Sequence, residues 1–139
     1  MSATETAGAQ RMRQWFEVSP FNRHLGLTLT RIEKNRVDVV MPFGPALATL
    51  ADVVHGGAIS ALADTAATMA SWAGVEDPGN ARGATVALTV EFLAAARGRD
   101  LTAVARVLRR GRSICFSEVD VTEPDGALVA KALVTYKIG

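Results

Sequence analysis

Hydrophobic and polar positions alternate in the first third of the chain, which predicts a β-hairpin. Within residues 36–43 the apolar side chains fall on one face of an extended segment: Val37, Val39, Met41 and Phe43. A period of two is typical of a strand with one buried face. Residues 26–33 form the expected partner strand, and Lys34-Asn35 supplies the turn between them.

The same alternation returns in the second half of the chain. Four strands are expected, over residues 84–93, 100–109, 113–122 and 127–138. In the first of them Val86, Leu88, Val90 and Phe92 share one side. The turn Arg110-Gly111-Arg112 and the segment Glu123-Pro124-Asp125-Gly126, which contains a strong turn sequence, separate the last three.

Between these two groups of strands the spacing predicts a long helix over residues 56–73. Apolar residues recur with a period near 3.6 and form one stripe: Ile59, Leu62, Ala66, Met69 and Ala73. Gly74 and Pro78-Gly79-Asn80 are expected to end the helix. Residues 44–54 are expected to form a loop.

The N-terminal segment predicts less structure. Residues 1–8 are small and polar and are expected to be frayed. A short helix is expected over residues 11–17, ending before Ser19-Pro20. Two runs of strands around one central helix favour an α+β fold, with an antiparallel sheet and the helix on one face. With 139 residues, the chain is expected to be a single domain, residues 1–139.

The central helix lacks a charged face. Opposite its apolar stripe lie only small or neutral residues and one acid: Gly57, Ser60, Ala61, Asp64, Thr68 and Ser71. A solvated face normally carries lysine, glutamate or arginine, so we expect something to cover this face. The simplest candidate is a second copy of the chain.

Composition narrows the class of protein. Hydrophobic residues make up 49% of the chain, charged residues 21%, and the net charge is +1, which disfavours a general nucleic-acid binder. No apolar run reaches membrane-span length, and the N-terminus lacks a signal-peptide core. A single cysteine, Cys115, fits a reducing cytoplasm and is expected to be buried and inert. His24 and His55 lack metal-ligand spacing, so no metal or cofactor is expected.

Asp64 and Gly56 are the candidate chemical groups, and each has two interpretations. Asp64 is either a structural acid bonded to its neighbours or a general base. The N–H of Gly56, at a helix start, either packs against a strand or stabilises an oxyanion. No Gly-x-Ser-x-Gly elbow is present, which disfavours a serine hydrolase.

His55-Gly56-Gly57, followed by Asp64 in an alanine-rich helix, resembles the motif of hotdog-fold thioesterases, in particular their phenylacetyl-CoA thioesterase-like (PaaI-like) branch. Ser19-Pro20-Phe21, Gly83-Ala84-Thr85 and the four-strand ending also fit. The resemblance implies a hotdog fold, an antiparallel sheet wrapped around the long helix. It also implies acyl-CoA hydrolysis at a dimer interface, without metal, coenzyme A being part of the substrate.

The resemblance also implies roles for individual residues. Asp64 matches the catalytic acid, acting as general base or nucleophile, and the N–H of Gly56 matches the group that polarises the thioester carbonyl. His55 matches a supporting histidine, and Thr85 a hydroxyl that helps to place water. Thr49 stands where relatives often carry asparagine and offers one donor and no amide. Gly57 and Thr68, on the uncharged face, are candidates for substrate contact.

Distance argues independently for a dimer. Gly56 and Asp64 are eight residues apart, which is about 12 Å along one helix. One carbonyl group cannot contact both, so a shared reaction requires the two groups to come from different subunits. A homodimer is therefore expected, and a homotetramer is a further expectation.

Basic residues crowd the region from residue 97 to residue 112. Arg109, Arg110 and Arg112 surround Gly111, and arginine forms bidentate bonds with phosphate, so this turn is a candidate site for the phosphates of coenzyme A. Simple solvation of the surface is the alternative. No aromatic stacking set accompanies the cluster, which disfavours nucleic acid.

Two other functions remain open at this point. One is a hotdog hydratase or dehydratase, whose motifs we do not find. The other is a non-catalytic domain that binds acyl-CoA. The acyl group itself, aryl or fatty, is left open, although Trp72 and Met69 are expected to line its pocket.

Overall fold

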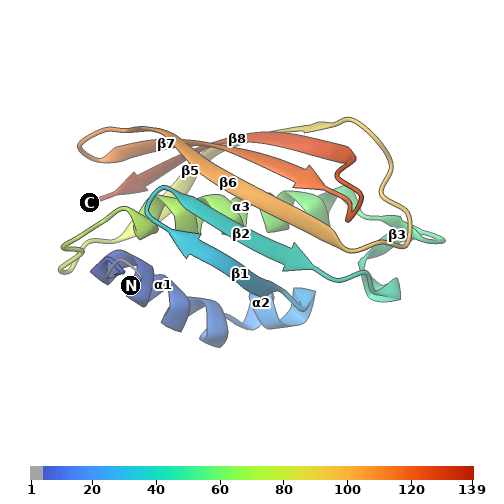
Figure 1. Cartoon of the computed structure of the whole chain (residues 1–139), viewed down its shortest axis with the longest axis horizontal. Helices are drawn as coiled ribbons and strands as arrows, with labels where there is room; N and C mark the ends of the chain where they lie inside the picture. The colour runs from blue at the N-terminus through green and yellow to red at the C-terminus, as the bar shows by residue number, and fades with distance from the viewer. Residues whose placement is uncertain (1–4) are drawn as a thin grey trace.

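The computed structural model describes residues 5–139, and over this range an antiparallel sheet curves around one long helix (Figure 1). The helix is α3 (Gly56–Ala73). The strands of the six-stranded sheet, in spatial order, are β1 (Thr28–Glu33), β2 (Arg36–Met41), β6 (Leu101–Arg110), β7 (Ile114–Thr122), β8 (Leu128–Ile138) and β5 (Gly83–Phe92). The α+β class and the hotdog arrangement expected from the sequence are confirmed.

Periodicity located the long elements well. Helix α3 has the bounds that its apolar spacing predicts, and the strands differ from prediction only at their ends. The predicted stripe of α3 is buried against the sheet, as are Val37, Val39 and Met41 of β2. Cys115 is buried as expected. Ser71, assigned to the face of α3 opposite this stripe, is fully buried, and its hydroxyl donates to the carbonyl of Ala67.

The N-terminal region is more ordered than the sequence suggested. Helix α1 runs from Ala7 to Val18, so the predicted helix over residues 11–17 was too short. Thr6 caps α1 by accepting from the N–H of Ala9, and its hydroxyl donates to the carbonyl of Ala73 at 2.6 Å. The expectation of fraying is therefore wrong for residues 5–8, while residues 1–4 lie outside the described part.

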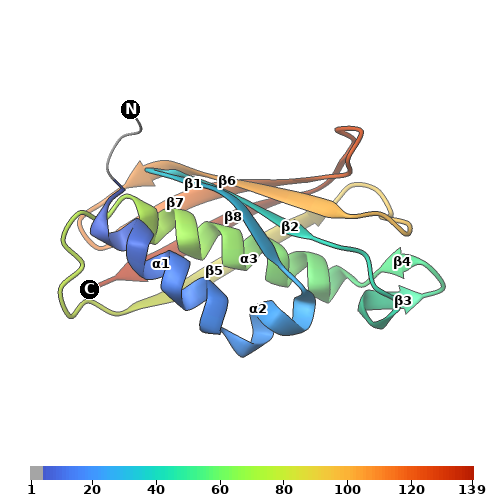
Figure 2. The same cartoon turned by 60° about the horizontal axis from the view of Figure 1, so that its bottom comes forward.

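Short elements were also missed. Ser19 ends α1 and caps a second helix, α2 (Pro20–Leu25). The expected loop over residues 44–54 contains η1 (Pro45–Leu47) and a small hairpin of β3 (Ala48–Leu50) and β4 (Val53–Val54). Figure 2 shows α1 and α2 lying along one side of α3, with α1 antiparallel to it.

Strand β5 is an edge of the sheet and contains a β-bulge. It pairs with β8, and the register shifts by one residue between Thr85 and Ala87. Because successive side chains alternate between faces, this extra residue places Thr85 on the same face as Leu88. Simple alternation had assigned Val86 to that face, and Val86 is instead 56% exposed.

The carboxyl end of α3 is closed by groups from distant parts of the chain. The guanidinium of Arg110 donates to the carbonyl of Ser71 at 2.7 Å and to the side-chain oxygen of Asn35 at 3.0 Å. The N–H of Gly8 donates to the carbonyl of Val75. Helix carbonyls in the last turn have no partner within the helix, and Arg110 supplies one for Ser71, while the bond to Val75 fixes the segment just after the helix. Within residues 5–139, no helix is both long and apolar enough to cross a membrane.

Replacement of Arg110 is expected to destabilise the fold. Arg110→Ala removes charge-assisted bonds to the end of α3, and we expect it to lower the free energy of unfolding by about 2 kcal/mol, measured in urea. Arg112→Ala is the matched control on the same turn, because Arg112 is exposed. Equal effects of the two changes would contradict the capping role.

Candidate active site

The amino end of α3 carries the first candidate group. His55 is the N-cap of this helix, and its Nδ1 accepts from the N–H of Gly57 at 2.7 Å. The N–H of Gly56 has no acceptor within residues 5–139. It therefore remains available at the positive end of the helix dipole.

A hollow opens beside this helix start. It measures about 480 Å³ and is lined by Gly56, Thr49, Phe92 and neighbouring apolar residues. A Cβ on Gly56 would lie 3.3 Å from the ring of Phe92, a close contact that this exposed ring can relieve by a small shift. The structure thus brings Thr49 and Gly56, which are distant from Asp64, to one hollow.

Asp64 lies two turns further along α3 and is half-buried. The hydroxyl of Thr85 donates to its Oδ1 at 2.6 Å. The β5 bulge makes this contact possible, because it turns Thr85 toward the helix. One carboxylate oxygen is oriented by this bond, and the other makes no hydrogen bond within residues 5–139.

Tyr136 lies near this carboxylate. It is opposite Thr85 in the β5–β8 pairing, and its hydroxyl accepts from Nε1 of Trp72 at 2.9 Å. Burial raises the pKa of Tyr136; the bond from Trp72 acts against this, and the negative charge of Asp64 adds to it. The phenol therefore stays neutral at physiological pH.

A groove lies along α3 and begins at Thr68, one turn after Asp64. It has a volume of about 330 Å³, with Thr68, Trp72 and Tyr136 on its floor and Trp15 of α1 on one wall. The expected role of Trp72 in lining a pocket fits this groove. The same expectation for Met69 is wrong, because Met69 is fully buried in the core.

The arginine-rich turn is divided in two. The guanidinium of Arg110 is bonded to Ser71 at the carboxyl end of α3 and to Asn35. These contacts do not support the expectation that Arg110 holds phosphate. A Cβ on Gly74 would lie 2.3 Å from its Nη2, which shows how closely it is seated. Arg109, Gly111 and Arg112 are exposed at the turn between β6 and β7.

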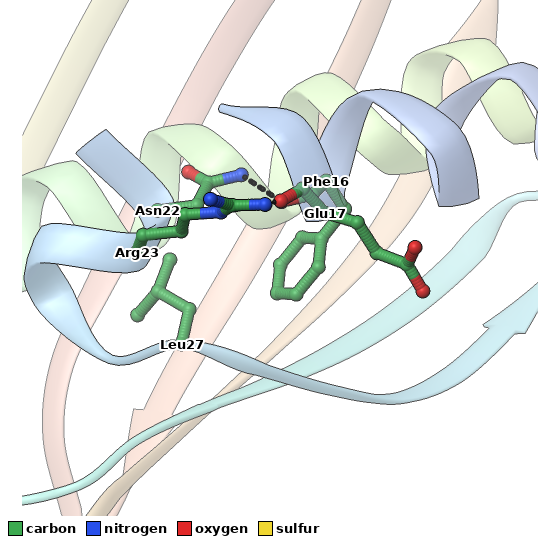
Figure 3. Close-up of a pocket in the computed structure, with 5 residues that line it drawn as sticks. All are labelled: Phe16, Glu17, Asn22, Arg23 and Leu27. Carbon is green, nitrogen blue, oxygen red and sulfur yellow. Dashed lines mark hydrogen bonds between the residues drawn. The ribbon is translucent and has the colours of Figure 1, made fainter. Parts of the chain in front are cut away.

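Another hollow lies at the corner of α1 and α2 and does not contact these groups (Figure 3). The side chains of Asn22 and Arg23, which line it, are already used within the corner. Asn22 donates to the carbonyl of Phe16, and Arg23 donates to the carbonyl of Glu17. These bonds fix the path between the two helices, so we assign this hollow a structural role.

Sequence reasoning missed the residues that α1 and β8 contribute. Trp15 falls within the short helix expected over residues 11–17, and Tyr136 is not among the expected site residues. The alternation in β8 places Tyr136 on the same face as the buried Val134 and Ala132, which is a signal that could have found it. Nothing in the sequence connects Trp15 to α3.

Comparisons with known proteins agree with the fold. Residues 43–130 match the model of the Thioesterase superfamily. The chain is 30% identical over 133 residues to the medium/long-chain acyl-CoA thioesterase YigI of Salmonella typhimurium, with 86% of each chain covered. A thioesterase family protein from Silicibacter pomeroyi is similar in structure, with 27% identity, a TM-score of 0.85 and coverage of 95% of this chain and 98% of that one.

The PaaI protein of E. coli is also similar in structure, with a TM-score of 0.85. It is 20% identical to this chain, and the match covers 96% of this chain and 95% of that one. At this identity the similarity concerns the fold.

The cap at His55 provides a test of how the helix start is held. His55→Ala removes the acceptor for the N–H of Gly57, and we expect it to lower the free energy of unfolding by about 1 kcal/mol. His55→Asn retains a capping oxygen and is expected to stay close to wild type. Urea unfolding compares the two, and an alanine variant as stable as the asparagine variant would contradict the capping role.

Proposed function

This chain belongs to the thioesterase superfamily, and on that premise we propose that it hydrolyses the thioester of an acyl-CoA to the free acid and coenzyme A. The family match, the acyl-CoA thioesterase activity named for its relative and the free N–H at a helix start support this reaction class. The observation that carries the mechanism is that strand β5 contacts both candidate groups: Thr85 bonds to Asp64, and Phe92 lies against Gly56.

In the proposed reaction a water molecule attacks the thioester carbon. Asp64 accepts the proton of that water as general base, while the Gly56 N–H stabilises the negative charge on the carbonyl oxygen. The C–S bond then breaks, and the thiolate of coenzyme A leaves and is protonated. Asp64 can instead attack the carbon directly, with water hydrolysing the resulting anhydride; both routes give the same products.

The two groups come from different subunits in this mechanism. Along one α3 they are about 12 Å apart, too far for one carbonyl group. Strand β5 passes both: its Thr85 end contacts Asp64, and its Phe92 end lies against Gly56. If two copies of β5 pair in antiparallel fashion, the Thr85 end of one meets the Phe92 end of the other.

The exposed edge of β5 supports this homodimer. The strand is ten residues long, pairs on one side only, and exposes Val86 and Phe92. A long apolar edge of this kind is prone to pair with another chain. Pairing also brings a partner toward the half-buried small face of α3, which carries Ser60, Ala61 and Thr68. Assembly of two such dimers into a tetramer stays a prediction.

The remaining site residues take supporting roles in the proposal. His55 fixes the helix start, Gly57 lets the substrate approach it, and Thr49 offers a hydroxyl to the hollow beside Gly56. Thr85 orients the carboxylate. For the phosphates of coenzyme A, Arg109 and Arg112 around Gly111 are the proposed ligands, since their side chains are exposed and Arg110 is occupied.

Asp64→Asn tests the chemistry. The amide keeps the size of the side chain and can still accept from Thr85, but it cannot take a proton from water. We expect kcat for acyl-CoA hydrolysis to fall by about a thousandfold, measured by thiol release. Thr85→Val is the companion variant and is expected to lose less activity, since the carboxylate remains. Turnover by Asp64→Asn close to wild type would refute the assignment, and hydrolysis absent even in wild type would favour an acyl-CoA-binding role.

Gly56→Pro tests the oxyanion contact and the shared site together. Proline removes the N–H and fits the first position of a helix. Gly56→Ala is the control, because it adds a side chain and keeps the N–H. We expect the proline variant to be inactive and the alanine variant to retain activity.

Mixing Gly56→Pro with Asp64→Asn, by refolding both chains together, should then restore activity. Half of the dimers would be mixed, and each would hold one intact site, so about a quarter of wild-type activity is expected. No recovery from a sample in which mixed dimers are demonstrated would contradict a site shared between subunits.

A further inference from the structure

Arg11 borders the groove between α1 and α3 and has no role in the proposed catalytic mechanism. Arg11, on α1, lies with its guanidinium carbon 5.6 Å from the centre of the Trp72 ring. Its Nη2 donates to the carbonyl of Gly79 at 2.8 Å, in the loop that follows α3. The side chain therefore spans from α1 to that loop across the indole.

Arg11 closes the end of the groove that is distant from Asp64. The floor runs along α3 from Thr68, one turn after Asp64, to Trp72, two turns after it. Because α1 is antiparallel to α3, Arg11 lies at the Trp72 end (Figure 2). The bond to Gly79 and the contact with Trp72 hold it across that end.

The groove is apolar on its α1 side, while Thr68, Tyr136 and Arg11 add polar groups to it. Trp15 and Met12 of α1 face Trp72 and Thr68, and Gly83 of β5 borders the floor. The missing side chain at Gly83 is necessary, because a Cβ there would lie 2.4 Å from the hydroxyl of Tyr136. Asp64, Thr68 and Trp72 are spaced by four residues and so lie along one side of α3, which places the groove one turn beyond the carboxylate.

We propose that the acyl group of the substrate lies in this groove and that Arg11 sets its maximum length. The inference rests on the proposed function, since it takes the thioester carbon to lie at Asp64. The helix rises about 12 Å from Asp64 to Trp72, which a straight acyl chain of about eight to ten carbons spans. Medium-length acyl groups are then the class that fits, and a longer chain meets the Arg11 side chain.

Part of the groove lies outside the family match, although Trp72 and Gly79, which hold Arg11, lie within it. Residues 43–130 contain Gly56, Asp64 and Thr85, whereas Arg11, Trp15 and Tyr136 fall outside that range. The length limit is therefore a feature that the flanking segments of this chain add to the shared catalytic region.

The test compares Arg11→Ala with Arg13→Ala over straight-chain acyl-CoA esters from four to sixteen carbons. Arg13 is on the same helix, exposed, and paired with Glu5, so its loss leaves the groove unchanged. In wild type and Arg13→Ala, kcat/KM should drop steeply beyond about ten carbons. In Arg11→Ala, esters of six to eight carbons should stay within about twofold of wild type, and those of fourteen to sixteen should gain about tenfold.

A purely structural role for Arg11 predicts a different result, an equal loss at all lengths, and that result would overturn the proposal. So would a wild-type profile without a drop, or an Arg11→Ala profile identical to that of Arg13→Ala. Calorimetric binding of non-hydrolysable alkyl-CoA thioethers of the same lengths gives a readout without turnover. A length limit in binding that only Arg11→Ala removes would support the end wall even if hydrolysis itself were absent.

Discussion

Helix α3 is an eighteen-residue helix with a single ionisable side chain, so it can exist only where the rest of the chain covers it and supplies partners for its ends. The sheet covers its apolar stripe. His55 satisfies an N–H in its first turn, and Thr6 and Arg110 satisfy carbonyls in its last. Because both ends are fixed in this way, the helix acts as a rigid spacer, and the distance between Gly56 and Asp64 is set by its rise alone.

The sequence predicted those parts of the fold in which local periodicity and tertiary burial agree. Helix α3 and the strands are of this kind, since their apolar spacing is visible within a few residues. The start of α1 is not: residues 5–10 carry few apolar side chains, and Thr6 is held by a carbonyl 67 residues away. The sequence did not reveal the structural role of Arg110 either, because its acceptors, Ser71 and Asn35, lie far away along the chain.

The candidate site likewise contains residues that the sequence could identify and one contact that it could not. Gly56 was recognisable because it opens a stretch with helical apolar spacing, whereas His55 was identified through the family motif. The resemblance implied that the Thr85 hydroxyl helps to place water, and its bond to Asp64 was not predicted. Strand alternation argued against such a bond, since it placed Thr85 on the face opposite Val86 and Leu88. The bulge reverses that parity, and a bulge formed by Thr85, Val86 and Ala87 has no glycine or proline to announce it.

Chemistry and substrate choice are carried by different segments in the mechanism proposed. The groups at the thioester lie on α3 and β5, which the sheet holds firmly, whereas the groove beyond them is bounded by α1. Helix α1 reaches the carboxyl end of α3 through the contacts of Thr6, Gly8 and Arg11, and none of these touches the bond between Thr85 and Asp64. A substitution on the α1 wall can therefore change which acyl group fits without disturbing the carboxylate that acts on it. The same separation explains why a motif centred on α3 identifies the reaction and leaves the acyl group undetermined.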